Sequence, residues 1–79
     1  MNYVYLLRSK VNPKKTYIGL TSDLSHRISE HNHHKNITTS GDESWEVEIY
    51  LAFRDPQKAK LFDRYLKHGL GHAFAKKYF

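Results

Sequence analysis

The sequence contains no cysteine among its 79 residues. Neither a disulfide nor a thiolate zinc site can therefore support the fold, and this absence fits a reducing, cytoplasmic location. No apolar run approaches the roughly 20 residues that a membrane span requires. The N-terminus lacks the basic-then-apolar order of a secretory signal. We expect one small domain over residues 1–79, near the lower size limit for folding on a single core.

Acidic residues are scarce in the last third of the chain. Residues 1–55 contain seven Lys or Arg and seven Asp or Glu, whereas residues 56–79 contain six basic residues against Asp63 alone. The whole formal charge of +5 thus arises in this C-terminal segment. A basic surface on a small domain is typical of nucleic-acid binding. An ordinary solvated helix face is the alternative that charge alone leaves open.

The N-terminal part of the chain predicts an antiparallel hairpin followed by a helix. Residues 1–8 alternate and are rich in β-formers, residues 12–14 (Asn-Pro-Lys) have turn composition, and residues 16–20 form a second β-type run. Gly19 inside that run suggests a bulge or a close backbone approach. Residues 21–23 (Thr-Ser-Asp) combine hydroxyls with an acidic side chain, as expected at a helix start.

The first predicted helix has one distinct face. Leu24, Ile28 and His31 share that face at three- and four-residue spacing, and Arg27 lies at its edge. Polar residues 35–44 follow and predict a loop.

A third strand is predicted over residues 45–53, where apolar and polar side chains alternate. Its apolar members are expected on one side of the sheet: Trp45, Val47, Ile49 and Leu51. Asp55 and Pro56 suit the N-cap and first turn of a second helix, and Gly69 suits its end. Residues 71–78 predict a last short helix. The order ββαβαα describes an α+β domain in which helices flank a small three-stranded antiparallel sheet.

Two phenols, a guanidinium and an imidazole occur close together in the chain. They are Tyr5, Tyr17, Arg27 and His31. Because the two strands can pair and the helix follows them directly, we expect these groups to converge and to form the candidate site. Each has an ordinary interpretation as well. Strand tyrosines often satisfy their hydroxyls within a sheet, and Arg27 can pair with Asp23 one helical turn away.

Asp63 and the histidines also have alternative interpretations. Asp63 lies beside the apolar side of its predicted helix, where an unpaired carboxylate is costly, so either a cation or Lys67 at i+4 is expected to accompany it. His31, His33 and His34 suggest a metal cluster, but no cysteine joins them and they fall at a helix end. We therefore do not predict a zinc site.

The ordered set of motifs resembles the GIY-YIG nuclease family. Tyr3-Val4-Tyr5 stands where the first tripeptide of the family falls, and Tyr17-Ile18-Gly19 matches the second letter for letter. Asp23 to Asn32 resembles the first helix of the family, with its arginine and following histidine. Residues 63–67, with residues 69–74 after them, resemble the acidic helix of small stand-alone members. The resemblance covers essentially the whole chain and extends to the N-terminal catalytic domain of an excinuclease.

The resemblance implies a metal-dependent endonuclease that hydrolyses DNA phosphodiester bonds, in DNA repair or recombination. It implies that Tyr17, or Tyr5 beside it, is the general base and that Arg27 holds the phosphate. His31 would relay a proton or orient Tyr17. Asp63 stands at the metal-binding glutamate of the family and would hold one Mg²⁺ or Mn²⁺, since a hard divalent ion accepts oxygen from either carboxylate.

DNA is the expected partner, contacted by Lys67, Lys76 and Lys77 and by the loop between Asn32 and Ser44. No membrane and no small-molecule cofactor are expected, and the protein is expected to be a monomer or a weak homodimer. The main alternative is a nucleic-acid-binding module of the same fold that cleaves weakly or not at all, because Asp63 is one methylene shorter than glutamate. A protein–protein adaptor is a third interpretation, which salt-dependent DNA binding would exclude.

Overall fold

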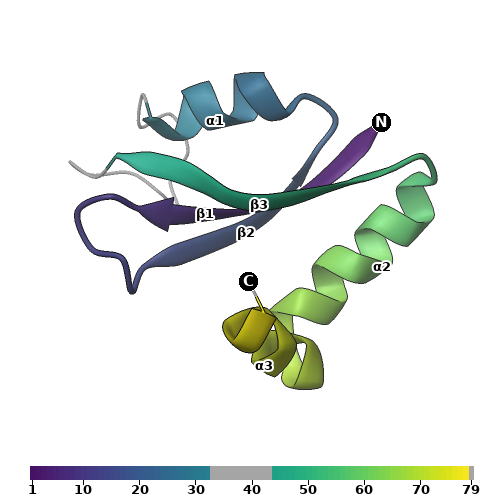
Figure 1. Cartoon of the computed structure of the whole chain (residues 1–79). Coiled ribbons are helices and arrows are strands. Elements are labelled where there is room, and N and C mark those ends of the chain that lie inside the picture. Colours follow the sequence, from purple (N-terminus) through teal and green to yellow (C-terminus); the bar gives the residue numbers. More distant parts are fainter. Residues whose placement is uncertain (33–43, 79) are drawn as a thin grey trace.

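The computed structural model describes residues 1–32 and 44–78 of the chain. Its three strands form one antiparallel sheet in the order β2-β1-β3, so the first strand is central (Figure 1). The elements in chain order are β1 (Asn2–Ser9), β2 (Thr16–Thr21), α1 (Leu24–Asn32), β3 (Trp45–Phe53), α2 (Pro56–Lys67) and α3 (Gly69–Tyr78). The predicted α+β class and the order ββαβαα are confirmed. None of the described helices is long and apolar enough to cross a membrane.

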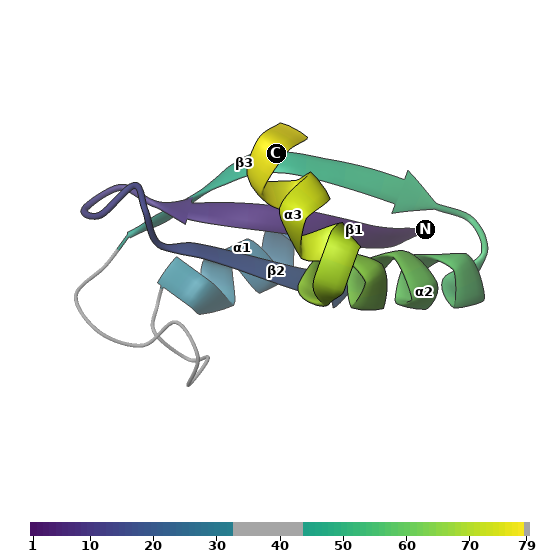
Figure 2. The same ribbon diagram turned by 90° about the horizontal axis from the view of Figure 1, so that it is seen from below.

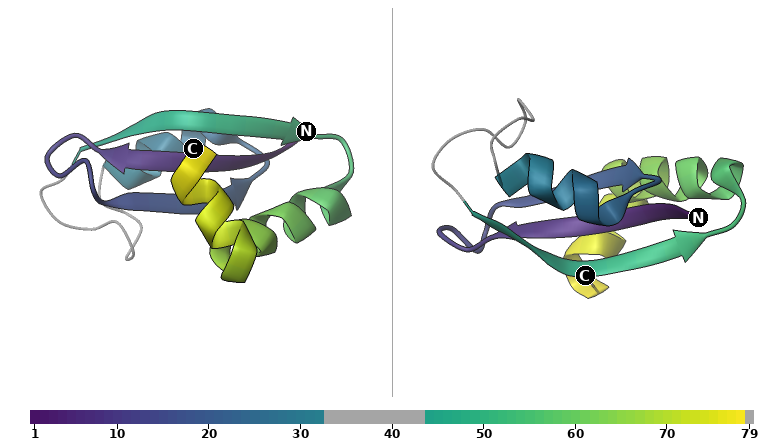
Figure 3. Two further views of the ribbon diagram at one scale, coloured as in Figure 1. Left: turned by 60° about the horizontal axis from the view of Figure 1, so that its bottom comes forward. Right: turned by 90° about the horizontal axis from the view of Figure 1, so that it is seen from above.

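The helices lie on both faces of the sheet. α1 covers one face, and α2 and α3 lie on the other (Figures 1 and 2), as the views from above and below also show (Figure 3). The side chains of β1 alternate between the face covered by α1 and the face covered by α2 and α3. Tyr5 and Leu7 point to the α1 side and pack with Leu24 and Ile28, while Val4 packs with α2 on the opposite side. The central strand is therefore buried on both faces, which explains its nearly continuous apolar sequence.

The alternation of β3 changes face at a bulge. Leu6 pairs with Ile49, but Leu7 pairs with Val47, so Glu48 is the extra residue on β3. Trp45 and Val47 pack on the α1 side, whereas Ile49 and Leu51 pair with β1 residues that face α2 and α3. The prediction that Trp45, Val47, Ile49 and Leu51 share one side is wrong. One extra residue in β3 moves the side chains on either side of it to opposite faces of the sheet. The sequence nevertheless continues to alternate between apolar and polar residues.

The helices begin and end where capping chemistry predicts, although the cap of α1 is the Asp23 carboxylate and not one of the hydroxyls before it. The Asp23 carboxylate accepts a hydrogen bond from the backbone N–H of His26 at 3.1 Å, at the start of α1. Asp55 caps α2 by accepting from the N–H of Gln57 at 2.8 Å, and Pro56 occupies the first turn. Gly69 has φ of +52°, the left-handed conformation that glycine adopts without strain, and it separates α2 from α3.

The C-terminal end of α1 is tied to the start of β3 by one side chain. Asn32 accepts a hydrogen bond from the backbone N–H of Trp45 at 2.7 Å and donates to its carbonyl oxygen at 3.1 Å. The amide thus pairs with the backbone as a neighbouring strand would. The predicted loop over residues 35–44 lies, apart from Ser44, outside the described residues, and so does most of the predicted substrate-contacting loop. The end of α1 and the start of β3 are therefore held together by the Asn32 side chain.

Candidate active site

A buried tyrosine and a buried histidine form the centre of the site. The Tyr5 side chain is 1% exposed and His31 is fully buried. The Tyr5 hydroxyl lies 3.0 Å from His31 Nε2, across 26 residues of sequence. The Tyr17 ring lies 4.8 Å from the His31 ring and 6.2 Å from the Tyr5 ring. We call Tyr5, Tyr17 and His31 the tyrosine–histidine cluster; it lies on the face of the sheet that α1 covers.

Gly19 makes room for this cluster. It is the cross-strand partner of Tyr5, and a Cβ placed on it would lie 2.5 Å from Tyr5 Cζ and 2.9 Å from Tyr17 Cε1. No real Cβ tolerates such contacts, so only glycine fits at this position. The predicted close approach is confirmed. It allows the phenol of Tyr5 to cross the neighbouring strand and lie at the edge of the sheet, where β2 has no outer neighbour.

Arg27 brings a positive charge to the cluster from α1. Its Nε lies 3.3 Å from Glu30 Oε1, and its side chain is 35% exposed. The alternative partner considered from sequence, Asp23, instead caps the helix. The Arg27 guanidinium acts electrostatically on both Tyr5 and His31. The convergence expected for Tyr5, Tyr17, Arg27 and His31 is therefore found.

Burial sets the protonation of the cluster. It raises the pKa of Tyr5 to about 12, and the neighbouring Tyr17 phenol and Asp63 carboxylate add to the rise, while Arg27 opposes it. Burial also lowers the pKa of His31, the nearby Arg27 charge lowers it further, and Glu30 partly offsets the effect. Both groups are therefore neutral near pH 7. In the tautomer that carries its proton on Nδ1, His31 accepts the hydroxyl hydrogen of Tyr5 at Nε2.

The neutral state of His31 predicts loss of stability in acid. Above pH 6.5 the imidazole is neutral in both the folded and unfolded states, so its contribution is fully present. Below pH 6.5 the unfolded state takes up the proton first, and stability falls by up to about 1.4 kcal/mol per pH unit until the folded ring also protonates. We expect this slope in urea unfolding of the wild-type protein and not in His31→Gln, in which the other histidines serve as the internal control. Equal slopes would contradict the assignment.

Asp63 approaches the cluster from the other side of the sheet. It lies on α2 with its side chain 15% exposed, and its charge reaches the Tyr5 hydroxyl. Lys67 Nζ lies 3.1 Å from Oδ1 and donates a hydrogen bond to Oδ2 at 3.2 Å. Oδ1 itself is buried and accepts no well-aligned hydrogen bond within the described residues. Asp63 thus pairs with Lys67, as one sequence alternative expected, and still presents one oxygen with unused acceptor capacity.

This donor set fits the metal that the sequence resemblance implies. A buried carboxylate oxygen without an aligned donor is the type of ligand that Mg²⁺ and Mn²⁺ prefer. Over residues 1–32 and 44–78, no three His, Asp or Glu side chains gather into a complete metal site. Asp63 would therefore be the main protein ligand, with water and substrate oxygens supplying the rest. His33 and His34 fall outside the described residues.

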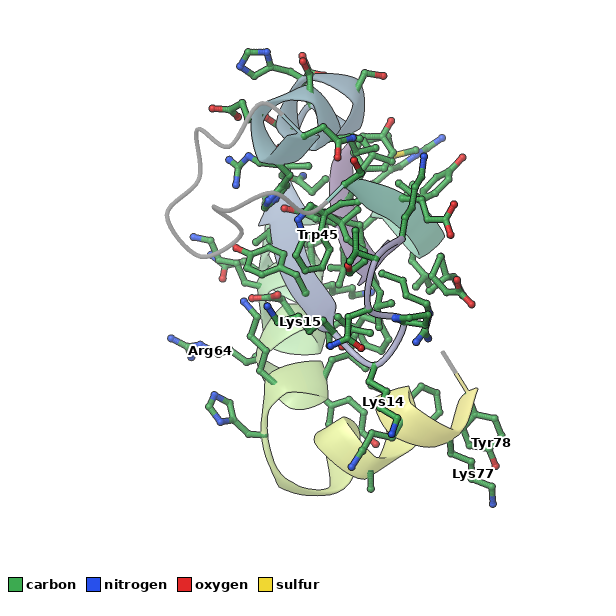
Figure 4. All side chains as sticks on the ribbon, turned by 90° about the vertical axis from the view of Figure 1, so that its left-hand side faces the viewer. Lys14, Lys15, Trp45, Arg64, Lys77 and Tyr78 are labelled. Carbon is green, nitrogen blue, oxygen red and sulfur yellow. The ribbon has the colours of Figure 1, made fainter. Side chains whose placement is uncertain are left out.

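The three lysines predicted to contact nucleic acid lie in three different environments. Lys67 pairs with Asp63. Lys76 lines a groove between α3 and the β1–β2 hairpin, together with Lys14. Lys77 lies over the Tyr78 ring, 5.3 Å from its centroid, on the outer side of α3 (Figure 4). They do not form one surface.

Two residues important for this arrangement were missed in the sequence. Asn32 was considered only as the end of a helix and the start of the predicted substrate-contacting loop, although an asparagine that ends a helix before a polar loop is a common link to nearby backbone. Lys14 was interpreted as a turn residue only. Its contact with α3 arises from tertiary structure, for which the sequence carries no local signal.

The fold and the site together define the class. A ββαβαα domain with a Tyr-Val-Tyr strand, a Tyr-Ile-Gly strand, an arginine on the first helix and an acidic residue on the second has the arrangement of a GIY-YIG domain. The chain matches the family model of the GIY-YIG catalytic domain over residues 1–78, so it belongs to the GIY-YIG family. This domain is a nuclease domain, and GIY-YIG nucleases generally use divalent metal ions. Comparisons with curated proteins and with solved structures gave no significant match.

Proposed function

We propose that the protein is an endonuclease that hydrolyses DNA phosphodiester bonds with one Mg²⁺ or Mn²⁺, in DNA repair or recombination. The observation that carries the proposal is the meeting of Tyr17, Arg27 and the charge of Asp63 around the Tyr5–His31 pair at the edge of the sheet. Hydrolysis of a phosphodiester needs a base for water, a cation for the phosphate and relief of charge on the leaving oxygen. One such site cuts one strand, which suits a monomer or weak homodimer that nicks DNA.

Tyr17 is the better candidate for the general base. Tyr5 is buried, its pKa is about 12, and its hydroxyl is engaged by His31. Tyr17 is only partly buried and lies on β2, a strand at the edge of the sheet. We assign proton abstraction from water to Tyr17, and we assign to Tyr5 the task of fixing the His31 ring against which Tyr17 packs.

Arg27 is suited to hold the scissile phosphate. Its Nε pairs with Glu30 and its guanidinium also interacts with the Tyr5 hydroxyl, and the five N–H donors of the fork exceed these two contacts. A guanidinium binds phosphate oxygens through paired donors and stabilises the extra charge of the pentacoordinate transition state. The Glu30 contact orients the side chain and costs the site little, because it is partly exposed.

Asp63 would hold the divalent ion through its buried Oδ1. When bound, such an ion supplies Lewis-acid neutralisation of charge on the phosphate and the leaving oxygen. Because the Lys67 ammonium lies against the same carboxylate, a cation bound there would weaken this pair. Lys67 is then released to contact a phosphate, which reconciles its present pairing with its predicted role in DNA binding.

Nicking of supercoiled plasmid tests the function. We expect the wild-type protein to produce nicked circles with Mg²⁺ or Mn²⁺ and none with EDTA. Asp63→Asn is expected to reduce the rate roughly 100-fold or more, since it removes the charge that holds the ion. Asp55→Asn is the matched control, because asparagine still caps α2. Cleavage that survives EDTA, or an Asp63→Asn variant as active as the control, would contradict the metal role; a wild-type protein that leaves duplex and single-stranded DNA uncut under both ions would overturn the endonuclease itself.

A further inference from the structure

A groove with a basic rim lies on the face of the sheet opposite the tyrosine–histidine cluster. Its volume is about 200 Å³. The floor is apolar and comes from the sheet and α3: Leu6, Ile18 and Ala75. The rim is cationic: Arg8, Lys14 and Lys76. We call this hollow the basic groove.

Arg8 is held in place at the rim. Its Nη1 donates to the Pro13 carbonyl oxygen at 2.5 Å, and its Nε lies 3.5 Å from Glu48 Oε2. Glu48 is the bulged residue of β3, so the register shift brings this carboxylate to Arg8. The guanidinium retains further N–H donors beyond these two contacts. A fixed arginine with spare donors is a preorganised group for an anion.

Lys14 and Lys76 reach the same groove from distant parts of the chain. Lys14 belongs to the hairpin turn and lies beside α3 (Figure 4), and Lys76 belongs to α3. Both are exposed, and within the part of the chain that the structure describes no carboxylate pairs with either ammonium group. Converging like charges repel one another, and a bound anion relieves that repulsion. The rim therefore carries an excess of positive charge at one small, partly apolar hollow.

The basic groove adjoins the candidate active site through β2. Thr16 and Ile18 line the groove, and the residue between them, Tyr17, points to the opposite face into the cluster. We propose that the groove binds a backbone phosphate of the DNA substrate other than the one that is cleaved. This inference rests on the proposed nuclease function and extends it, because a DNA strand that passes the free edge of β2 contacts both faces. The apolar floor accommodates the sugar next to that phosphate.

DNA binding by a double variant tests the groove. In Lys14→Ala/Lys76→Ala, we expect the slope of log K against log salt for a labelled duplex to fall in magnitude by about 1 to 2. Because these lysines are proposed to contact the substrate, cleavage at subsaturating DNA should fall in step with the affinity. The matched control is Arg54→Ala/Lys58→Ala, which removes the same charge from the connection between β3 and α2 and from the start of α2; the start of α2 lies far from the β1–β2 hairpin (Figure 1). Lys14→Arg/Lys76→Arg retains the charge and should bind as wild type does.

The outcomes separate this inference from the proposed function. The proposal is supported if the salt slope falls in Lys14→Ala/Lys76→Ala but not in the control, and if Lys14→Arg/Lys76→Arg binds as wild type does. If the salt slope falls equally in the groove variant and in the control, the lysines contribute only a diffuse attraction to DNA, and the groove proposal is overturned. A groove variant that binds as wild type does while the wild-type protein nicks plasmid also overturns the groove and leaves the nuclease proposal intact. A wild-type protein that neither binds nor nicks DNA defeats both.

Discussion

Replacement of Arg27 by alanine is expected to lower the rate of DNA cleavage at saturating substrate by about 10²–10³-fold, the usual loss when one electrostatic stabiliser of a transition state is removed. The guanidinium acts electrostatically on Tyr5 and His31, and the proposed mechanism assigns it to the scissile phosphate. Its ion pair with Glu30 is partly exposed and contributes little to folding, so the variant should remain folded. Single-turnover cleavage of a labelled duplex measures the effect separately from binding.

The controls for this prediction distinguish charge from geometry. Arg27→Lys keeps the charge without the paired donors, so it should recover only part of the rate. Arg54→Ala removes an exposed arginine between β3 and the N-cap of α2 and should cleave as wild type does. In the same assay, Tyr17→Phe should lose cleavage, while Tyr5→Phe should keep a larger part of it. An Arg27→Ala protein with the wild-type rate would remove Arg27 from the mechanism.

The second large effect is expected at Gly19. An added methyl group would lie 2.5 Å from Tyr5 Cζ and 2.9 Å from Tyr17 Cε1. Gly19→Ala must therefore displace a fully packed ring, which typically costs about 1–3 kcal/mol of unfolding free energy. Displacement of Tyr5 also breaks its contact with His31, so cleavage should fall with stability. Urea unfolding and plasmid nicking measure the two effects.

A double-mutant cycle shows whether Tyr5 is the source of the strain. Tyr5→Leu removes the part of the side chain that the new methyl group would meet, so Gly19→Ala should cost less in that background. If Gly19→Ala is as destabilising with Leu at position 5 as with Tyr, the clash lies elsewhere. If Gly19→Ala is neutral in the wild-type protein, the close approach of the Tyr5 ring to Gly19 is wrong.

The fold was largely predictable because its signals are local. Alternation marked the strands, and Asp23, Asp55 and Gly69 marked the helix ends through capping chemistry. The bulge at Glu48 was not predictable, because the alternation of β3 continues unbroken through it. The register depends on how β3 pairs with β1, and the sequence of β3 alone does not determine that pairing.

The sequence predicted which residues gather at the candidate site better than it predicted which atoms contact one another. The spacing of Leu24, Ile28 and His31 indicated the buried face of α1, and this face does pack on Tyr5. That the Tyr5 hydroxyl meets His31 Nε2, rather than Tyr17 doing so, depends on the space that Gly19 leaves. The pairing of Asp63 with Lys67 follows from i+4 spacing, and its position near Tyr5 follows from the packing of α2 against the sheet. Lys14 gained a role only because α3 folds back toward the hairpin.

The pairing of Asn32 with the backbone of Trp45 sets the distance between the end of α1 and the start of β3, whatever the length of the segment that connects them. The two hydrogen bonds join the ends of the segment that runs between α1 and β3. His31 directly precedes Asn32, so the junction also holds the backbone next to the buried imidazole. Lengthening a closed loop costs little, about 0.6 kcal/mol for each doubling. We therefore expect insertions in this segment to leave the end of α1 and the start of β3 in place.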